Sequence, residues 1–207
     1  MRASNHGELG LIVLSSCKEL GRLVDERILQ LRAEEDDDKS YLVPIEEVRF
    51  SNGEGKIKLL DSVRGKDIYI LCDVGNYSCE YTMFGRNHCM GPDEHFQDIK
   101  RVLSAIGGKA DRVTVIMPLL YASRQHKRKG RESLDCAMAL KELENLGVHA
   151  ILTFDVHDPT IHNAIPGTSF ENIFPTYSML KCFIANEGAN IKKDNMTVIS
   201  PDTGAMA

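Results

Sequence analysis

The chain has 207 residues, of which 43% are apolar and 27% are charged, and its formal net charge is −5. This composition is typical of a globular protein and excludes wholesale disorder, collagen and coiled coil. No apolar run is long enough to span a membrane, and the negative charge argues against non-specific nucleic-acid binding by the whole surface.

Short apolar runs alternate with stretches of helical period, which predicts an α/β fold with a largely parallel central sheet flanked by helices. In chain order the predicted elements are a strand at Leu11–Leu14, a helix at Cys17–Arg32, an extended segment at Tyr41–Phe50, a strand at Lys56–Leu60, a strand at Ile68–Val74, a helix at His95–Ile106, a strand at Arg112–Met117, a helix at Glu132–Leu146, a strand at Ala150–Phe154 and a strand at Thr197–Ser200. The turn residues at 51–55 predict a β-hairpin between Tyr41–Phe50 and Lys56–Leu60. Gly75–Pro92 is expected to be irregular, and the acidic block at 34–38 is expected to be a solvated loop.

The six cysteines are scattered and form no Cys-x-x-Cys pair. Without a secretion signal they indicate reduced thiols in a cytoplasmic protein. Cys79, His88 and Cys89 could be imagined as part of a zinc site, but the paired short spacings of zinc ligands are missing, which favours ordinary unliganded side chains.

Charged residues follow three of the predicted strands. A basic run from Arg124 to Arg131 follows Arg112–Met117, the pair Asp155 and His157 follows Ala150–Phe154, and Asp202 follows the last predicted strand. The carboxyl ends of parallel strands meet at one edge of a sheet, which is where such folds bind ligands. If the strand stays extended to His157, the side chains of Asp155 and His157 project to the same side.

These residue types suit a polyphosphate with its metal ion. Asp155 and Asp202 are candidate Mg²⁺ ligands and His157 is a less usual one, because magnesium prefers oxygen. Arg124, Gln125 and Lys127 could hold polyphosphate oxygens. Cations, carboxylates and a divalent ion on one edge meet the requirements of phosphoryl transfer.

Each of these signals also has a structural interpretation. A basic run of this kind is commonly a solvated face, and an Asp-x-His pair at a strand end is commonly structural. The common phosphate-binding glycine motifs are absent from the sequence. The residues alone therefore indicate an α/β domain with an edge suited to anions and metal, and leave the class of chemistry open.

Taken together and in this order, several stretches resemble ribose-phosphate pyrophosphokinase, also called phosphoribosyl pyrophosphate synthetase. The matching stretches are Arg49–Glu54, Ser62–Ile70, Arg112–Pro118, Tyr121–Gln125, Phe154–His157 and Val198–Gly204. The resemblance implies a phosphoribosyltransferase-type domain. It also implies Mg-dependent transfer of the diphosphoryl group of ATP to the anomeric hydroxyl of ribose 5-phosphate, which gives phosphoribosyl diphosphate and AMP.

The resemblance also implies roles for individual residues. The ATP-binding residues would be Phe50, Asn52, Gly53, Glu54, Arg124, Gln125 and Lys127, with Phe50 stacked on adenine and Asn52 and Glu54 bonded to its edge. His157 would be catalytic, and Asp155, His157 and Asp202 would lie at the magnesium site. The hairpin would reach into a neighbouring subunit, since family members form hexamers built from dimers. ATP and ribose 5-phosphate are then the expected small-molecule partners, and neither nucleic acid nor membrane is expected as a partner.

The chain departs from the family pattern in places. His126 stands where members usually have Asp, Ala164 replaces a carboxylate, and Gly75–Pro92 is expanded. The resemblance assigns residues 1–198 to an N-terminal, ATP-side domain and residues 199–207 to the start of a missing second domain, which would supply the ribose 5-phosphate loop and the catalytic Lys and Arg. The chain is therefore expected to be inactive alone. The alternative is a non-catalytic regulatory homologue that binds nucleotide or an active synthetase.

Overall fold

The computed structural model describes residues 7–32, 39–191, 197, 199 and 200, apart from the side chains of residues 189 and 190. The chain divides into two compact units, one ending at Ile173 and one beginning at Phe174, and each is described by itself. The acidic block and Asp202 lie outside the described residues.

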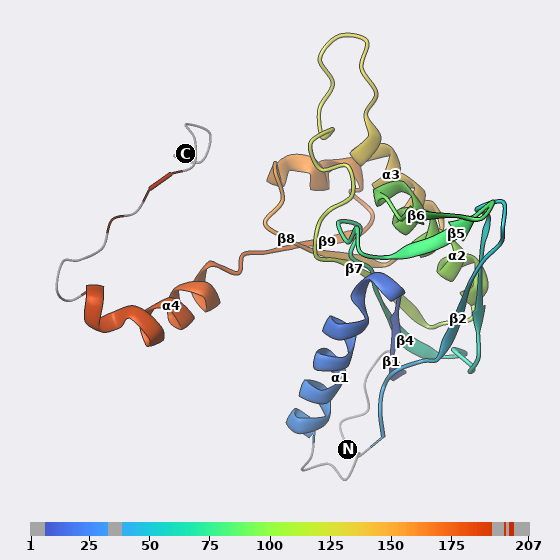
Figure 1. Cartoon of the computed structure of the whole chain (residues 1–207), viewed down its shortest axis with the longest axis horizontal. Coiled ribbons are helices and arrows are strands. Elements are labelled where there is room, and N and C mark those ends of the chain that lie inside the picture. Colours follow the sequence, from blue (N-terminus) through green and yellow to red (C-terminus); the bar gives the residue numbers. More distant parts are fainter. Residues whose placement is uncertain (1–6, 33–38, 192–196, 198, 201–207) are drawn as a thin grey trace. The chain divides into compact units, whose positions relative to one another are not determined.

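The first unit contains most of the secondary structure (Figure 1). Its elements are β1 (Glu8–Val13), the 3-10 turn η1 (Ser15–Cys17), α1 (Lys18–Arg32), β2 (Ile45–Arg49), β3 (Gly55–Leu59), β4 (Lys66–Leu71), β5 (Glu80–Met83), β6 (Arg86–Cys89), α2 (Pro92–Ile106), β7 (Arg112–Met117), α3 (Asp135–Asn145), β8 (Ala150–Phe154), the 3-10 turn η3 (Pro159–Ala164) and β9 (Ser169–Ile173).

Five strands form one parallel sheet in the order β1-β4-β7-β8-β9. The register places Glu8 opposite Lys66, Asp67 opposite Arg112, Thr114 opposite Ala150, and Ala150 also opposite Ser169. The predicted α/β fold with a parallel central sheet is confirmed.

Alternate residues of each central strand belong to two different cores, because successive side chains point to opposite faces of a sheet. Ile12 and Ile70 pack in a core with α2 and α3, whereas Leu11 and Leu71 pack in a smaller core with α1. The central strands read as continuous apolar runs because helices cover both of their faces.

Two antiparallel hairpins accompany the sheet. β2 and β3 form the hairpin that the turn residues predict, and it lies against α2. β5 and β6 form a second hairpin inside Gly75–Pro92, so the expectation of an irregular segment is wrong there. Its strands are polar and its turn is Phe84-Gly85 rather than Asn-Gly, so the usual hairpin signal was missing. Within this hairpin His88 stacks on Tyr81 with 5.9 Å between the ring centroids.

The strand predicted at Thr197–Ser200 does not form in the residues that are described. Thr197, Ile199 and Ser200 belong to no strand, and β9, which the sequence did not predict, is the last strand of the described sheet. β-branched residues favour a strand only where a neighbouring strand can accept their backbone hydrogen bonds.

The second unit contains α4 (Thr176–Ile191), which the sequence did not predict. Within the described residues, no helix is both long enough and apolar enough to cross a membrane.

Candidate functional site

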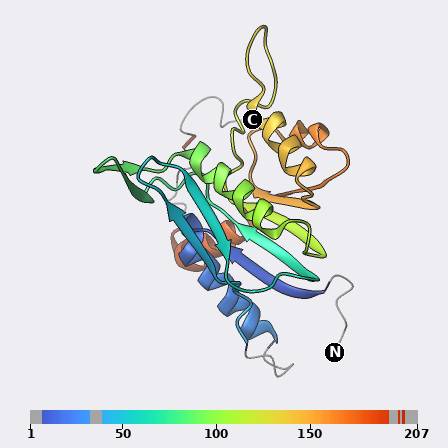
Figure 2. The same cartoon turned by 90° about the vertical axis from the view of Figure 1, so that its right-hand side faces the viewer.

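Two polar segments meet where β7 and β8 end. The long connection from β7 to α3 projects from the body of the first unit (the yellow loop in Figures 1 and 2), and the turn at 155–158 follows β8 directly. The backbone joins them at their bases, because the Phe154 N–H donates to the Pro118 carbonyl at 3.3 Å. The segments that follow β7 and β8 are therefore neighbours, as their positions after adjacent parallel strands predicted.

His126 is the main side-chain link between the two segments. Its side chain is only 8% exposed, and its Nε2 lies 3.0 Å from Asp158 Oδ2. This contact has the distance of an ion pair without the geometry of a hydrogen bond. The His126 ring also meets the His157 ring edge-on, with 5.2 Å between centroids. Lys127 Nζ lies 3.9 Å from Asp158 Oδ2 and keeps a largely exposed side chain.

Asp158 caps the turn that follows it. Its Oδ1 accepts hydrogen bonds from the Thr160 hydroxyl at 2.6 Å and from the Thr160 N–H at 2.9 Å. These two bonds, with smaller contributions from His126 and Lys127, lower the pKa of the Asp158 carboxyl, although partial desolvation opposes them. Asp158 is therefore a carboxylate at neutral pH, and it balances cationic charge at the base of the loop.

Asp155 departs from the geometry that the sequence suggested. β8 ends at Phe154, and Asp155 has a left-handed backbone with φ of 47°, so the strand does not stay extended to His157. The Asp155 N–H donates to the Ile173 carbonyl at 3.1 Å, which holds this turn against the end of β9. Both Asp155 and His157 are exposed, so the turn presents a carboxylate and an imidazole to solvent.

The start of the long loop is fixed, while its cationic side chains point to solvent. The Tyr121 ring stacks on Phe96 at 4.3 Å between centroids, and its hydroxyl donates to Asp93 Oδ1 at 2.7 Å. Desolvation, followed by the bond to Asp93, raises the pKa of Tyr121 to about 12, so it stays a neutral donor. Beyond this anchor, Arg124 and Gln125 are exposed.

Of the three residues predicted to bind magnesium, Asp155 and His157 are among the described residues. No cluster of three His, Cys, Asp or Glu side chains exists among them, and Asp202 is not one of them. The exposed carboxylate of Asp155 has the chemistry of a Mg²⁺ ligand, because this ion keeps several waters and takes only one or two carboxylates from a protein.

The predicted adenine-binding residues lie at the tip of the β2–β3 hairpin. Phe50 is 47% exposed. Asn52 and Glu54 are joined by two hydrogen bonds, from Asn52 Nδ2 to Glu54 Oε2 at 3.0 Å and from the Glu54 N–H to Asn52 Oδ1 at 3.1 Å. Gly53 has φ of 88°, the left-handed conformation that favours glycine. Among the described residues, no hydrogen bond or ion pair joins this tip to Arg124 or His157.

A hollow at the carboxyl ends of the central strands was not predicted. It measures about 330 Å³ and is lined by the segment 15–20 together with Asp73, Asn76 and Pro118. The Asp73 N–H donates to Ser16 Oγ at 3.1 Å, and Asn76 Nδ2 donates to the Ser16 carbonyl at 2.9 Å. β4 ends at Leu71, so Asp73 lies beyond the strand and not inside it as the prediction of Ile68–Val74 implied; the available signal was a carboxylate at the end of a buried apolar run.

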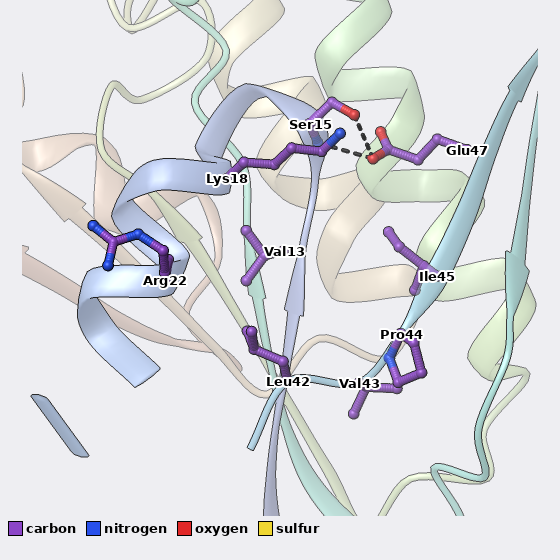
Figure 3. Close-up of a pocket in the computed structure, with 9 residues that line it drawn as sticks. All are labelled: Val13, Ser15, Lys18, Arg22, Leu42, Val43, Pro44, Ile45 and Glu47. Atoms are coloured by element: carbon purple, nitrogen blue, oxygen red, sulfur yellow. Dashed lines mark hydrogen bonds between the residues drawn. The ribbon is translucent and has the colours of Figure 1, made fainter. Parts of the chain in front are cut away.

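A larger hollow of about 430 Å³ lies beside the edge strand β1, between α1 and the segment 42–47 (Figure 3). Ser15 and Glu47 close one end of it, because the Ser15 N–H and hydroxyl both donate to Glu47 Oε1, at 2.9 and 2.6 Å. None of the predicted site residues lines this hollow, so it is separate from the site at the ends of β7 and β8.

A family model and curated relatives that match this sequence all bear the name ribose-phosphate pyrophosphokinase. The family model described as the N-terminal domain of ribose phosphate pyrophosphokinase matches residues 9–147. Curated relatives with the name ribose-phosphate pyrophosphokinase include one from Chromobacterium violaceum, 26% identical over 161 residues, which cover 76% of this chain and 43% of the relative. Another, from Oceanobacillus iheyensis, is 25% identical over 162 residues, which cover 76% of this chain and 44% of the relative.

The fold has a solved counterpart. The phosphoribosylpyrophosphate synthetase of Mycobacterium smegmatis superposes with a TM-score of 0.67 at 19% identity, over 88% of this chain and 53% of that one. The chain thus spans less than half the length of the curated relatives that it matches.

Proposed function

Because the chain belongs to the family of the N-terminal domain of ribose phosphate pyrophosphokinase, we propose that it is the ATP-side part of a ribose-phosphate diphosphokinase. In the proposed reaction the anomeric hydroxyl oxygen of ribose 5-phosphate bonds to the β-phosphorus of ATP. The bond from that phosphorus to the oxygen it shares with the α-phosphorus breaks, AMP leaves with the electron pair, and the hydroxyl proton is released. The products are phosphoribosyl diphosphate and AMP.

The long loop between β7 and α3 carries the basic run 124–131 and is called the cationic loop here. The observation that carries the proposal is the contact between this cationic loop and the turn at 155–158 after β8. His126 and Lys127 face Asp158, and the ring of His126 meets that of His157. This arrangement supports a polyphosphate site in which Arg124, Gln125 and Lys127 bind phosphate oxygens and His157 contacts the diphosphoryl group as the catalytic residue. Positioning and charge neutralisation dominate catalysis of phosphoryl transfer, so exposed cations next to an imidazole at one edge of the sheet suit it.

We assign magnesium to Asp155 and His157, with Asp202 as a third candidate ligand. The ion would neutralise negative charge on the phosphate oxygens of ATP. The exposure of Asp155 and His157 leaves room for the water molecules that Mg²⁺ retains.

The adenine end of ATP is assigned to the β2–β3 hairpin. Phe50 would stack on the base, while Asn52, Gly53 and Glu54 would lie along its edge. No described hydrogen bond or ion pair joins this turn to the cationic loop, which suits a site completed by a second copy of the chain in a homo-oligomer. In this proposal residues 1–198 supply the ATP side of the site.

The first test is ATP binding by an Arg124→Ala variant, measured by isothermal titration calorimetry with magnesium present. A charge-assisted contact to phosphate contributes about 1.5–3 kcal/mol, so the dissociation constant should rise about tenfold or more. The loss should shrink with added salt, because the screening length falls from about 10 Å at 0.1 M to about 3 Å at 1 M.

The matched control is Arg27→Ala, which removes an exposed arginine of α1 that donates to Gln30. It should bind ATP like the wild type. Equal affinity of wild type and Arg124→Ala would show that the basic loop is only a solvated surface, and a wild-type chain without affinity for ATP would overturn the proposal.

A further inference from the structure

The turn of the β5–β6 hairpin contains an unusual residue. The turn is Phe84-Gly85, with φ of 49° and 76°, so both residues have left-handed backbones. Two-residue hairpin turns of this type favour Asn-Gly or Gly-Gly. A phenylalanine in this conformation is strained, because its Cβ crowds the following carbonyl oxygen.

Packing does not compensate for that strain. The Phe84 residue is 76% exposed, so its ring gains little from burial in the chain. A strained residue persists only where the surroundings impose it, and such residues are concentrated at ligand sites. The combination of a strained backbone with an exposed aromatic ring therefore points to a contact outside the hairpin.

The Phe84 turn lies against the turn that holds the predicted adenine-binding residues. The Phe84 N–H donates to the Ser51 carbonyl at 2.9 Å, so Phe84 is bonded to the residue next to Phe50. A Cβ built on Gly53 would lie 2.8 Å from Met83 Sδ, so the Met83 side chain at the end of β5 also lies against the β2–β3 turn. Figures 1 and 2 both show the tips of the two hairpins side by side.

The β5–β6 hairpin is also anchored to the rest of the first unit. The Tyr81 hydroxyl donates to Glu94 Oε1 at 2.6 Å, and the Arg49 guanidinium lies over the Tyr81 ring at 5.5 Å. Arg49 is in turn paired with the buried Asp98 of α2. The hairpin that carries Phe84 is therefore held through Tyr81 to both β2 and α2.

We propose that Phe84 is a second aromatic contact for the purine base bound at the β2–β3 turn, beside Phe50. The inference rests on the proposed function, because it takes the nucleotide to be ATP and its base to lie at this turn. A base presents a flat face to an aromatic ring and a hydrogen-bonding edge to polar groups. The two exposed phenylalanines would supply the rings, and the paired Asn52 and Glu54 would supply the edge contacts.

The test replaces the ring without harming the turn. Phe84→Asn gives the Asn-Gly pair that a two-residue hairpin turn prefers, so its thermal unfolding midpoint should equal or exceed that of the wild type. Its dissociation constant for ATP should nevertheless rise by about fivefold to a hundredfold, the range found when a base loses one aromatic partner. Phe84→Tyr keeps the ring and should retain the affinity of the wild type.

A spectroscopic version uses the absence of tryptophan from the chain. Phe84→Trp then carries the only indole, and stacking on adenine should quench its fluorescence as ATP is added. The matched control is Leu31→Trp at an exposed position of α1, which is 67% exposed in the wild type. Its fluorescence should not respond to ATP.

The outcomes separate the inference from the proposed function. If Phe50→Ala weakens ATP binding while Phe84→Asn binds like the wild type, the inference is wrong and the proposed function stands. If Phe84→Asn changes only the sedimentation coefficient, the ring contacts a second copy of the chain and the inference is also wrong. A wild-type chain that does not bind ATP overturns both.

Discussion

Glu47 shows how one side chain balances opposing contributions. Burial disfavours its charged form, while two hydrogen bonds from Ser15 favour it. Burial has the larger effect, so the pKa of the Glu47 carboxyl is raised above its usual value. The folded state therefore holds this proton to a higher pH than the unfolded chain does. As pH rises from the ordinary value toward the raised one, this group lowers the stability of the fold.

Glu47→Gln should remove that pH dependence. The amide oxygen can still accept both bonds from Ser15, but the variant buries no charge. The free energy of unfolding should be higher than that of the wild type at pH 7, and the difference should shrink as pH falls below the ordinary pKa of a glutamic acid. Chemical denaturation at several pH values measures this. The exposed neighbour Glu46 provides the control, since Glu46→Gln should not show the same trend. A constant difference at every pH would contradict the assignment.

The sequence predicted some site residues through their position after strands and missed others. Arg124 and His157 follow β7 and β8, and the parallel sheet brings their segments together as expected. Asp158 was not singled out, because its importance depends on contacts with His126 and Lys127 from a distant part of the chain. The left-handed backbone of Asp155 was equally hidden, since it accompanies a hydrogen bond to Ile173, a residue of a strand that the sequence did not predict.

Helix α1 lies close against strand β1 at a glycine, Gly21. A Cβ on Gly21 would lie 2.4 Å from Val13 Cγ1 and 2.5 Å from Val13 Cγ2, and Gly21 is buried. Glycine normally weakens a helix, so its presence inside α1 is explained by this packing rather than by helix propensity. The spacing between α1 and β1 therefore depends on Gly21 having no side chain.

Gly21→Ala should destabilise the protein although alanine favours helices. Overpacking of a core costs about 1–3 kcal/mol, whereas replacing glycine by alanine inside a helix gains about 1 kcal/mol in helix propensity. The cost therefore exceeds the gain over most of its range. Adding Val13→Ala should restore stability relative to Gly21→Ala alone, because it removes the atoms that clash. Chemical denaturation of the wild type and the three variants measures the coupling. Gly188→Ala in α4 is the control, since its Cβ would meet only Ile184 Cγ2 at 3.9 Å, and a stable Gly21→Ala variant would contradict the close approach.

Whole elements were predicted where the chain is strongly periodic. The central strands are continuous apolar runs, because both of their faces are buried. Helix α1 has apolar residues at steps of three and four, because one of its faces packs on the sheet. β9 has only alternate, partly buried residues, and its polar Ser169, Glu171 and Asn172 hid it. α2 begins at Pro92, three residues before the predicted start, and the signal was Pro92 followed by Glu94, whose carboxylate accepts from the Gly91 N–H at 2.6 Å.

At the scale of the whole molecule, the six cysteines differ widely in their surroundings. All are free thiols, with Cys17, Cys72 and Cys136 buried and Cys89 and Cys182 exposed. Burial is the main cause that raises the pKa of Cys17 and Cys136 to about 12, and it raises the pKa of Cys72 as well. Since the thiolate is the reactive form, reactivity should follow this division.

Alkylation by iodoacetamide at pH 8, followed by peptide mass spectrometry, should therefore label Cys89 and Cys182 first. Cys17, Cys72 and Cys136 should be labelled much more slowly in the folded chain. In concentrated urea all six should react at similar rates, which provides the control. Labelling of Cys136 as fast as Cys89 in the folded protein would show that the core around α3 is open.

The strands of the described sheet lie side by side in the order in which the ribosome makes them. That order is β1, β4, β7, β8 and β9 both across the sheet and along the chain. No strand has to insert between two that have already paired. As the polypeptide leaves the ribosome, each new strand can join the free side of the one before it. Assembly can thus proceed in one direction, without the rearrangement of earlier pairs that interleaved topologies demand during translation.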